Sequence, residues 1–238
     1  MTLRVFLTGE WRFLAMLNYR VDAALLAPLV PRGTTLDDWL GATYVSLVGF
    51  LFRDTRVLGV PVPLHRDFEE VNLRFYVRRH VCDEVRRGVV FVRELVPKRA
   101  IATIARTFYG EPYLAVPMKH EIEHVDLSVR VKYSWRRGSE WESITMKASG
   151  EPQSIPAGSH AEFITEHYWG YTRLQAGCSE YRVEHPRWKV WNADTFEFNA
   201  DVSALYGEQF VETLSASPRS AFIADGSPIT VERRSLLL

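Results

Sequence analysis

The sequence predicts an α+β protein in which strands outnumber a few short helices. Residues 68–79 alternate between apolar and polar side chains with the period of a strand. Residues 43–52 are rich in the Val, Tyr and Phe that favour strands. Asp22 can cap a short apolar segment, residues 23–29, as a helix. Similar short segments recur along all 238 residues, so we expect sheet to dominate.

The central stretch, residues 88–120, begins with the apolar run Val89–Val92, which is typical of a strand buried on both faces. Pro97 suits the first position of a helix, because its missing N–H would have no partner there. A helix is therefore predicted to follow, with an apolar stripe at positions i, i+3, i+4 and i+7 formed by Ile101, Ile104, Ala105 and Phe108.

The second half of the chain continues the same pattern. Residues 125–135 alternate as one long strand, and a turn at residues 136–139 predicts a hairpin with residues 141–148. Ser159 and Glu162 fit a capping box before a short helix. Residues 150–158 could form a linker, but strand patterns lie on both sides with no change in composition, so we expect one domain, residues 1–238.

Composition excludes some classes of partner. Lys plus Arg and Asp plus Glu both number 29, which gives no reason to expect binding to nucleic acid or to an anionic membrane. Charged residues interrupt the apolar N-terminus, no segment is long and apolar enough to span a bilayer, and Cys82 and Cys178 cannot make a disulfide framework. We therefore expect a cytoplasmic protein. The sequence does not decide whether the protein forms a homo-oligomer.

Familiar enzyme motifs are absent or misplaced. The sequence has no phosphate-binding loop, dinucleotide fingerprint or nucleophile elbow. His120–His124 matches H-E-x-x-H, but the alternation after it predicts a strand, in which residues four apart lie about 13 Å apart and cannot share a zinc ion. We therefore expect neither a metal nor a cofactor.

Three places carry candidate chemistry. Glu70, Asn72, Arg74 and Tyr76 share one face of a predicted strand, which is either a polar cavity wall or a solvated sheet face. His167 lies among aromatic and ionisable residues, where a pocket wall competes with an ordinary histidine at a helix end. Lys98 is either a solvated lysine or an amine nucleophile, and a neighbouring cation such as Arg99 favours the neutral amine.

Several segments together resemble the YqjF-like family of uncharacterised proteins, which is similar in fold to acetoacetate decarboxylase. They are NYRVD at residues 18–22, NLRFYV at 72–77, RELVPKR at 93–99, EHYWG at 166–170 and YRVEHP at 181–186. The resemblance implies a large, curved, mostly antiparallel sheet that closes into a cone or barrel around a small-molecule pocket.

The likeness to the decarboxylases also implies site residues. Their Arg-Glu-Leu segment leads to Pro-Lys-Lys, whose first lysine forms a Schiff base and whose second perturbs it. Lys98 would then be the nucleophile, Arg99 the perturbing cation, Arg12 a pocket residue and, by strand geometry, Glu70 an acidic one. The spacer is two residues shorter here, which moves a side chain about 7 Å along the same strand face.

Two main functional hypotheses follow. The first is an enzyme that acts on a small oxo-acid or carbonyl compound through a Schiff base on Lys98, as a decarboxylase, hydratase or aldolase. The second is a non-catalytic protein that binds a small organic acid in the cone, and a structural module with a filled cone is a third. The expected ligand-binding residues are Arg12, Arg74, Tyr76, Glu94, His167 and Tyr168.

Overall fold

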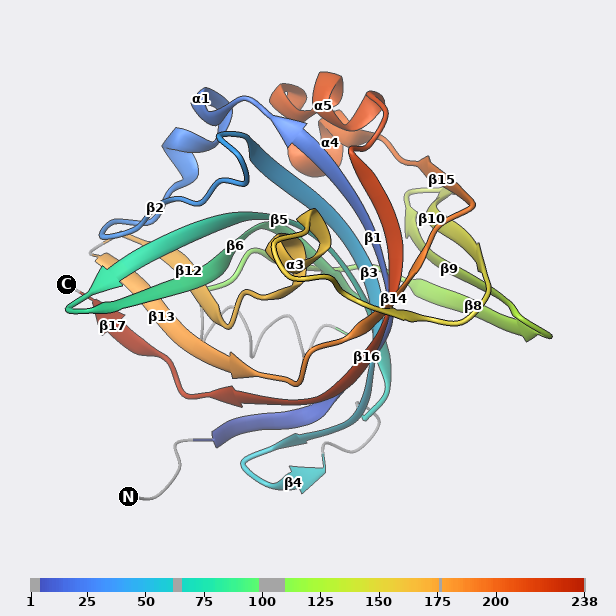
Figure 1. Cartoon of the computed structure of the whole chain (residues 1–238), viewed down its shortest axis with the longest axis horizontal. Coiled ribbons are helices and arrows are strands. Elements are labelled where there is room, and N and C mark those ends of the chain that lie inside the picture. The colour runs from blue at the N-terminus through green and yellow to red at the C-terminus, as the bar shows by residue number, and fades with distance from the viewer. Residues whose placement is uncertain (1–4, 62–65, 99–109, 176, 238) are drawn as a thin grey trace.

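The computed structural model describes residues 5–61, 66–98, 110–175 and 177–237. It shows an α+β fold of two sheets and a few short helices, as predicted (Figure 1). The α-helices are α1 (Ala23–Leu26), α3 (His160–Thr165), α4 (Val202–Tyr206) and α5 (Val211–Ser215), and the 3-10 helices are η1 (Ala27–Leu29) and η2 (Glu208–Phe210). Capping by Asp22 and by Ser159 is confirmed, since each side chain accepts a backbone N–H of the helix that it precedes.

The larger sheet is strongly curved, which confirms the predicted architecture. Its long strands are β1 (Val5–Val21), β3 (Thr43–Val57), β5 (Phe68–Val81), β6 (Glu84–Val96), β12 (Trp169–Leu174), β13 (Gly177–Glu184) and β16 (Ser220–Glu232). Shorter strands are β2 (Thr35–Leu36), β4 (Val60–Pro61), β7 (Tyr113–Ala115), β11 (Gln153–Ser154), β14 (Lys189–Asn192) and β17 (Ser235–Leu237). Pairing is antiparallel except where β6 meets β7 and β12.

Strand β13 pairs with β16, so the curved sheet closes on itself and has an inner face. Val183 lies opposite Val231, and Glu184 lies opposite Thr230. Because β16 also pairs with β1, the order β16-β1-β3-β5-β6-β12-β13 returns to β16. Side chains that point inward from these strands therefore face one another.

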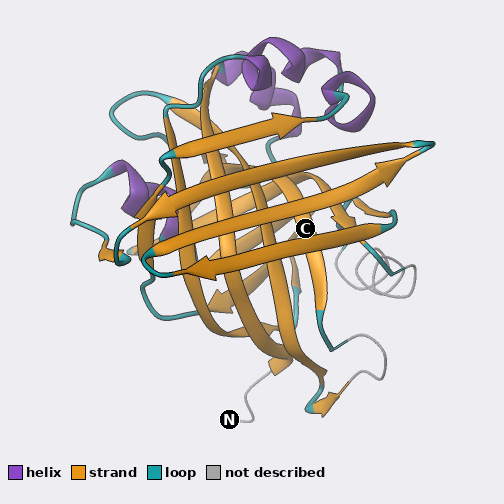
Figure 2. Ribbon diagram, turned by 90° about the vertical axis from the view of Figure 1, so that its right-hand side faces the viewer, coloured by secondary structure: helices purple, strands orange, loops and turns teal. Residues whose placement is uncertain are grey.

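The smaller sheet packs against the outer face of the larger one (Figure 2). It consists of β8 (Met118–Val125), β9 (Ser128–Arg137), β10 (Glu140–Ser149) and β15 (Thr195–Asn199). Tyr133 of β9 donates to the carbonyl of Phe13 at 2.8 Å. Its ring packs so closely on Gly49 that a Cβ there would lie 2.7 Å from Cδ2. A glycine in β3 thus lets the two sheets approach.

One predicted strand begins later in the structure than expected. The strand predicted to start at Val125 is wrong at its beginning, because β8 ends there, Asp126 takes a positive φ of 52°, and β9 starts at Ser128. Val125 and Leu127 extend the apolar alternation into a turn, where both are exposed. The hairpin of β9 and β10 is confirmed. The helix predicted after Pro97 lies outside the described residues.

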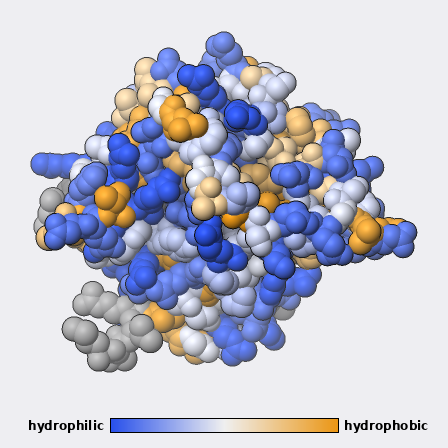
Figure 3. Space-filling view, viewed as in Figure 1, coloured by the Kyte–Doolittle hydropathy of each residue, from blue (hydrophilic) through white to orange (hydrophobic). Residues whose placement is uncertain are grey.

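One face of the molecule is mainly polar, with apolar residues scattered among the polar side chains (Figure 3). Among the described residues, no helix is long and apolar enough to cross a membrane.

Candidate functional site

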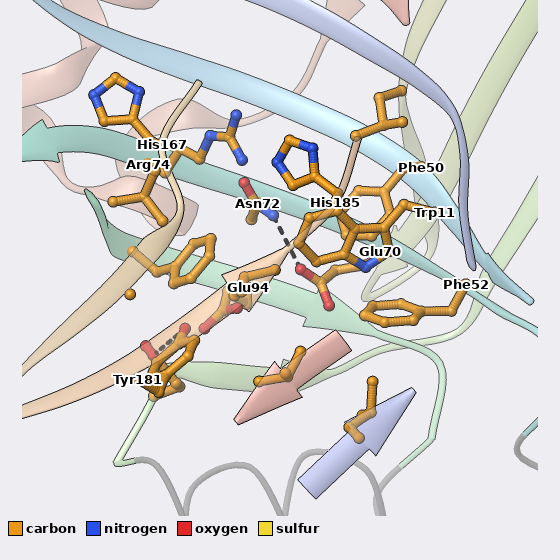
Figure 4. Close-up of a pocket in the computed structure, with 18 of the residues that line it drawn as sticks. Trp11, Phe50, Phe52, Glu70, Asn72, Arg74, Glu94, His167, Tyr181 and His185 are labelled. Atoms are coloured by element: carbon orange, nitrogen blue, oxygen red, sulfur yellow. Dashed lines mark hydrogen bonds between the residues drawn. The ribbon is translucent and has the colours of Figure 1, made fainter. Parts of the chain in front are cut away.

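A pocket opens on the inner side of the large sheet (Figure 4). It contains about 1300 Å³ of empty space, counted to include the open solvent at its mouth. Much of its wall is aromatic and is supplied by β1, β3, β5 and the segment before β14. The aromatic residues from these elements are Phe6, Trp11, Phe50, Phe52, Phe68 and Trp188, and other parts of the wall add Phe91, Tyr113, Trp169 and Tyr181. Such a wall would exclude water from a bound molecule and strengthen polar contacts inside.

Strand β5 supplies the polar wall. Glu70, Asn72 and Arg74 point into the pocket, while the alternate residues Val71 and Leu73 are fully buried in the core between the sheets. The period of two therefore separates a polar pocket face from an apolar core face. Of the two alternatives for this strand, the structure shows the cavity wall.

Three glutamates form a buried carboxyl cluster in the pocket. Glu70, Glu94 and Glu111 are each no more than 4% exposed. Glu70 and Glu94 come from neighbouring strands, β5 and β6, and Glu111 precedes β7, which pairs with β6. Burial of three carboxyl groups so close together disfavours full ionisation, because like charges repel more strongly away from water.

Hydrogen bonds hold two members of the carboxyl cluster in place. Asn72 donates to Glu70 Oε1 at 2.9 Å. Thr172 and Tyr181 donate to Glu111 Oε1 at 2.8 and 2.9 Å. Oε2 of Glu94 and Oε2 of Glu111 are buried and have no hydrogen-bond partner among the described residues. These two oxygens are therefore the carboxyl atoms of the cluster whose hydrogen bonding is incomplete.

The pKa values of the carboxyl cluster are raised. Burial raises the pKa of Glu70 to about 7, against the opposing hydrogen bonds from Asn72 and Tyr113 and the charge of Arg74. Burial likewise raises the pKa of Glu111 to about 7. The pKa of Glu94 lies well above its ordinary value because of burial and the charges of the other two. The cluster therefore keeps protons near neutral pH and can both donate and accept them.

Arg74 is the buried cation of the pocket. Its side chain donates to the carbonyl of Ile164 at 3.4 Å, and its Nε has no partner among the described residues. No ion pair joins Arg74 to a carboxylate within that part of the chain. Glu70 is near enough to feel its charge but makes no direct ion pair with it, so the guanidinium can still bind a carboxylate ligand.

His167 lies on the same side of the pocket as Arg74 (Figure 4). It follows α3, and its Nε2 lies 3.3 Å from Oδ2 of Asp37. Burial lowers the pKa of His167 to about 4, and the charges of Arg87 and Arg74 act in the same direction. The imidazole is therefore neutral at pH 7.

The other predicted site residues lie apart from the pocket wall. Lys98 is exposed just after β6 and does not line the pocket, and Arg99 lies outside the described residues. Arg12 pairs with Glu10 at 2.9 Å and is also not a lining residue. Tyr76 packs behind His167 with ring centroids 4.6 Å apart. Tyr168 lines a second depression instead.

Sequence reasoning missed Glu111, Tyr113, Tyr181 and Asp37 as site residues. Glu111 and Asp37 lie in irregular segments, where no periodicity indicates which way a side chain points. The strand alternation could have placed Tyr181 on the same face as Val183, two residues along. The alternation could not have shown that Tyr181 bonds to Glu111.

Known proteins with similar sequences or structures give the chain a family and a fold. The model of DUF2071, described as "Uncharacterized conserved protein", matches residues 8–228. The protein YqjF of Bacillus subtilis (strain 168), described as uncharacterised, is 28% identical over 189 residues, which cover 77% of this chain and 74% of YqjF.

Two solved structures show the fold. Acetoacetate decarboxylase from Legionella pneumophila superposes with a TM-score of 0.64 at 15% identity, covering 98% of this chain and 87% of the decarboxylase. The enduracididine biosynthesis enzyme MppR complexed with pyruvate has a TM-score of 0.67 at 12% identity, covering 100% of this chain and 92% of MppR. The two likenesses concern the fold and do not by themselves assign a reaction.

Proposed function

Because the chain belongs to the DUF2071 family and has the fold of acetoacetate decarboxylase, we propose that it acts on a small organic acid with a carbonyl group. The carboxylate of the ligand would lie against Arg74, and its carbonyl oxygen would face the carboxyl cluster. One observation carries the proposal: an aromatic-walled pocket holds both an arginine that makes no direct ion pair among the described residues and three proton-holding carboxyl groups.

The carboxyl cluster supplies the chemistry in this proposal. A protonated carboxyl group donates to a carbonyl oxygen as that oxygen gains negative charge, which lowers the barrier to breaking a bond on the adjacent carbon. Arg74 fixes the acid group so that the same carbonyl meets the same donor each time. Pyruvate, a small 2-oxo acid, is the ligand bound to MppR, which supports this class of substrate.

A Schiff base on Lys98 is the alternative route to the same chemistry. Its amine would have to reach the pocket, whereas in the structure Lys98 is exposed. Lys98 instead acts on Glu69: burial raises the pKa of Glu69, but the hydrogen bond from His120 and the charges of His120 and Lys98 are among the effects that lower it overall. Glu69 does not line the pocket, unlike its neighbour Glu70. Acid–base chemistry by the carboxyl cluster needs no movement of Lys98, which is why we favour it.

Ligand binding and trapping together test the proposal. Thermal unfolding is followed with pyruvate, acetoacetate and a panel of 2-oxo and 3-oxo acids, each compared with its neutral amide, while product formation is followed by NMR. Stabilisation by the acids alone, with turnover, supports the proposal. If no acid stabilises the protein, the proposal is wrong.

Borohydride separates the two routes and the non-catalytic alternative. Reduction of a Schiff base leaves a stable adduct, which mass spectrometry locates. An adduct on Lys98 that is lost in Lys98→Ala would select the Schiff-base route. Turnover that persists in Lys98→Ala without an adduct would select the carboxyl cluster. Stabilisation with neither adduct nor turnover would select a protein that binds an organic acid without reaction.

A further inference from the structure

His167 lines the pocket beside Arg74 and forms a buried pair with Asp37, which lies behind the pocket wall and which the proposed chemistry does not use. Asp37 follows β2, and its backbone N–H donates to the carbonyl of Tyr76 at 3.0 Å, which fixes the segment on β5. Its carboxylate accepts from Arg87 Nε at 2.7 Å and faces His167 Nε2 at 3.3 Å. Asp37 is therefore held by its backbone on β5 and by its carboxylate on Arg87 of β6, and the carboxylate faces one nitrogen of the imidazole.

The ionised carboxylate sets the tautomer of His167. Burial would raise the pKa of Asp37, but the hydrogen bonds from His167 and Arg87 and their charges outweigh it and lower the pKa to about 2. Because an ionised carboxylate only accepts, His167 Nε2 carries the proton and Nδ1 keeps a free lone pair. Nδ1 is buried and has no hydrogen-bond partner among the described residues.

Packing keeps the imidazole in this orientation. The ring of Tyr76 lies 4.6 Å from that of His167, and Phe163 meets it edge-on at 5.3 Å. An unpaired polar atom in the interior is unfavourable, but it is not decisive alone, because Nε2 of His160, a histidine away from the pocket, is also buried without a partner among the described residues. His167 differs in that its side chain lines the pocket, so a bound ligand can supply the partner that its Nδ1 lacks among the described residues.

We propose that His167 is a catalytic base of the pocket, that Asp37 positions it, and that the pair makes the site an enolising one. The inference rests on the proposed function and narrows its substrate class to oxo-acids with a C–H bond beside the carbonyl group. Such a bond could lie at Nδ1 while the acid group is on Arg74 and the carbonyl oxygen faces the carboxyl cluster.

The step balances within the site. His167 Nδ1 takes the proton from the carbon, the electron pair of the C–H bond forms a C=C bond, and the carbonyl π pair moves to oxygen. That oxygen takes a proton from a carboxyl group of the cluster. The products are an enol, an imidazolium stabilised by Asp37, and a carboxylate; the reverse step restores all three.

Nuclear magnetic resonance of ¹⁵N-labelled histidine tests the pair without any ligand. Wild type should show His167 at pH 7 as the neutral tautomer with hydrogen on Nε2, and Asp37→Asn should lose that preference. A protonated ring, or hydrogen on Nδ1, would overturn the proposal. His160→Gln helps with assignment, since His160 is another buried histidine but does not line the pocket.

Exchange of ligand hydrogen with D₂O tests the chemistry, with pyruvate and the other oxo-acids as probes. His167→Gln keeps a donor near Asp37 but has no base, so the exchange rate should fall about 10²–10⁴-fold, whereas the matched His160→Gln should keep the wild-type rate. Wild-type exchange in His167→Gln would overturn the inference and leave the proposed function intact. No exchange by wild type with any bound oxo-acid would also overturn it.

The rate–pH profile separates positioning from a structural role. The rate should rise with pH through the pKa of His167, about 4, and fall as the carboxyl cluster ionises near its pKa values of about 7. Arg74 and Arg87 are the cations that face His167, and Asp37 is the anion. Because Asp37 raises the pKa of His167, Asp37→Asn should shift the acidic limb to lower pH. A limb that does not move would show that Asp37 only supports the fold, contrary to the proposal.

Discussion

Tyr113 donates a hydrogen bond to Oε2 of Glu70 at 3.1 Å, and in the sheet Tyr113 lies beside Glu94. Burial, together with the charges of the carboxyl cluster, raises the pKa of Tyr113 well above its ordinary value, so its hydroxyl stays protonated and donates. The short strand β7 thus contributes a fixed donor to the carboxyl cluster. This donor favours the ionised form of Glu70, although burial favours the neutral form more strongly.

Removing this donor should change how Glu70 titrates. In Tyr113→Phe, Glu70 loses a hydrogen bond that stabilises its charged form, so its pKa should rise above the wild-type value of about 7. Carboxyl ¹³C NMR of labelled glutamate measures the shift, and Glu70→Gln assigns the signal. An unchanged titration of Glu70 would show that Tyr113 does not interact with it in solution.

Stability should fall as pH rises from about 4.5 to 7 through the contribution of Glu111. Its pKa of about 7 in the folded protein is above its ordinary value of 4.5, so the folded state binds more protons between these values. The contribution is fully present below pH 4.5 and is lost as pH rises through 7. Glu111→Gln should therefore flatten the pH dependence and raise the unfolding free energy at pH 8 by a few kcal/mol.

Urea unfolding at several pH values measures this effect. Glutamine keeps an acceptor for Thr172 and Tyr181, so the comparison isolates the charge. Glu197→Gln, on the exposed part of β15, is the matched control and should follow wild type. Equal slopes for wild type and Glu111→Gln would mean that Glu111 titrates normally.

The polar face of β5 was predictable because the two-residue period requires no knowledge of the rest of the fold. Glu70, Asn72 and Arg74 follow from local alternation alone. Asp37 and His167 are 130 positions apart, and their contact depends on where a segment between strands is anchored. No local pattern contains that information, so the pair could be found only in the structure.

The prediction that Lys98 is a nucleophile rests on resemblance and stays a prediction. Lys98 follows β6 by two residues, and Glu94 in the same strand does face the pocket. The resemblance correctly indicated the family and the fold, which depend on the whole chain. Strand alternation fixes the direction of a side chain only within the strand. Because β6 ends at Val96, that alternation does not determine where Lys98 points.

Arg74→Gln should weaken binding of small oxo-acids roughly ten- to a hundredfold, because a hydrogen-bonded ion pair with the ligand carboxylate is lost. Neutral amides of the same ligands should bind equally to both proteins. Calorimetric titration measures the two affinities, with the exposed Arg20→Gln as control. Equal losses for acids and amides would point to a collapsed pocket instead of a lost charge.

Gly170 leaves the space that Tyr181 needs to reach Glu111. The two residues lie opposite each other in β12 and β13, and a Cβ on Gly170 would lie 2.1 Å from Tyr181 Cζ, far inside contact distance. Gly170→Ala should therefore displace the ring, destabilise the protein by about 1–3 kcal/mol and break the hydrogen bond to Glu111. The pKa of Glu111 should then rise above about 7, because this bond lowers it.

Tyr181→Phe distinguishes packing from hydrogen bonding at this position. It removes the same hydroxyl while the ring stays, so it should raise the pKa of Glu111 with a smaller loss of stability than Gly170→Ala. Urea unfolding and carboxyl ¹³C titration provide the two readouts for both variants. If Gly170→Ala left the Glu111 titration unchanged, Tyr181 would have room to move without losing its bond, and the glycine would not be required for the geometry of the carboxyl cluster.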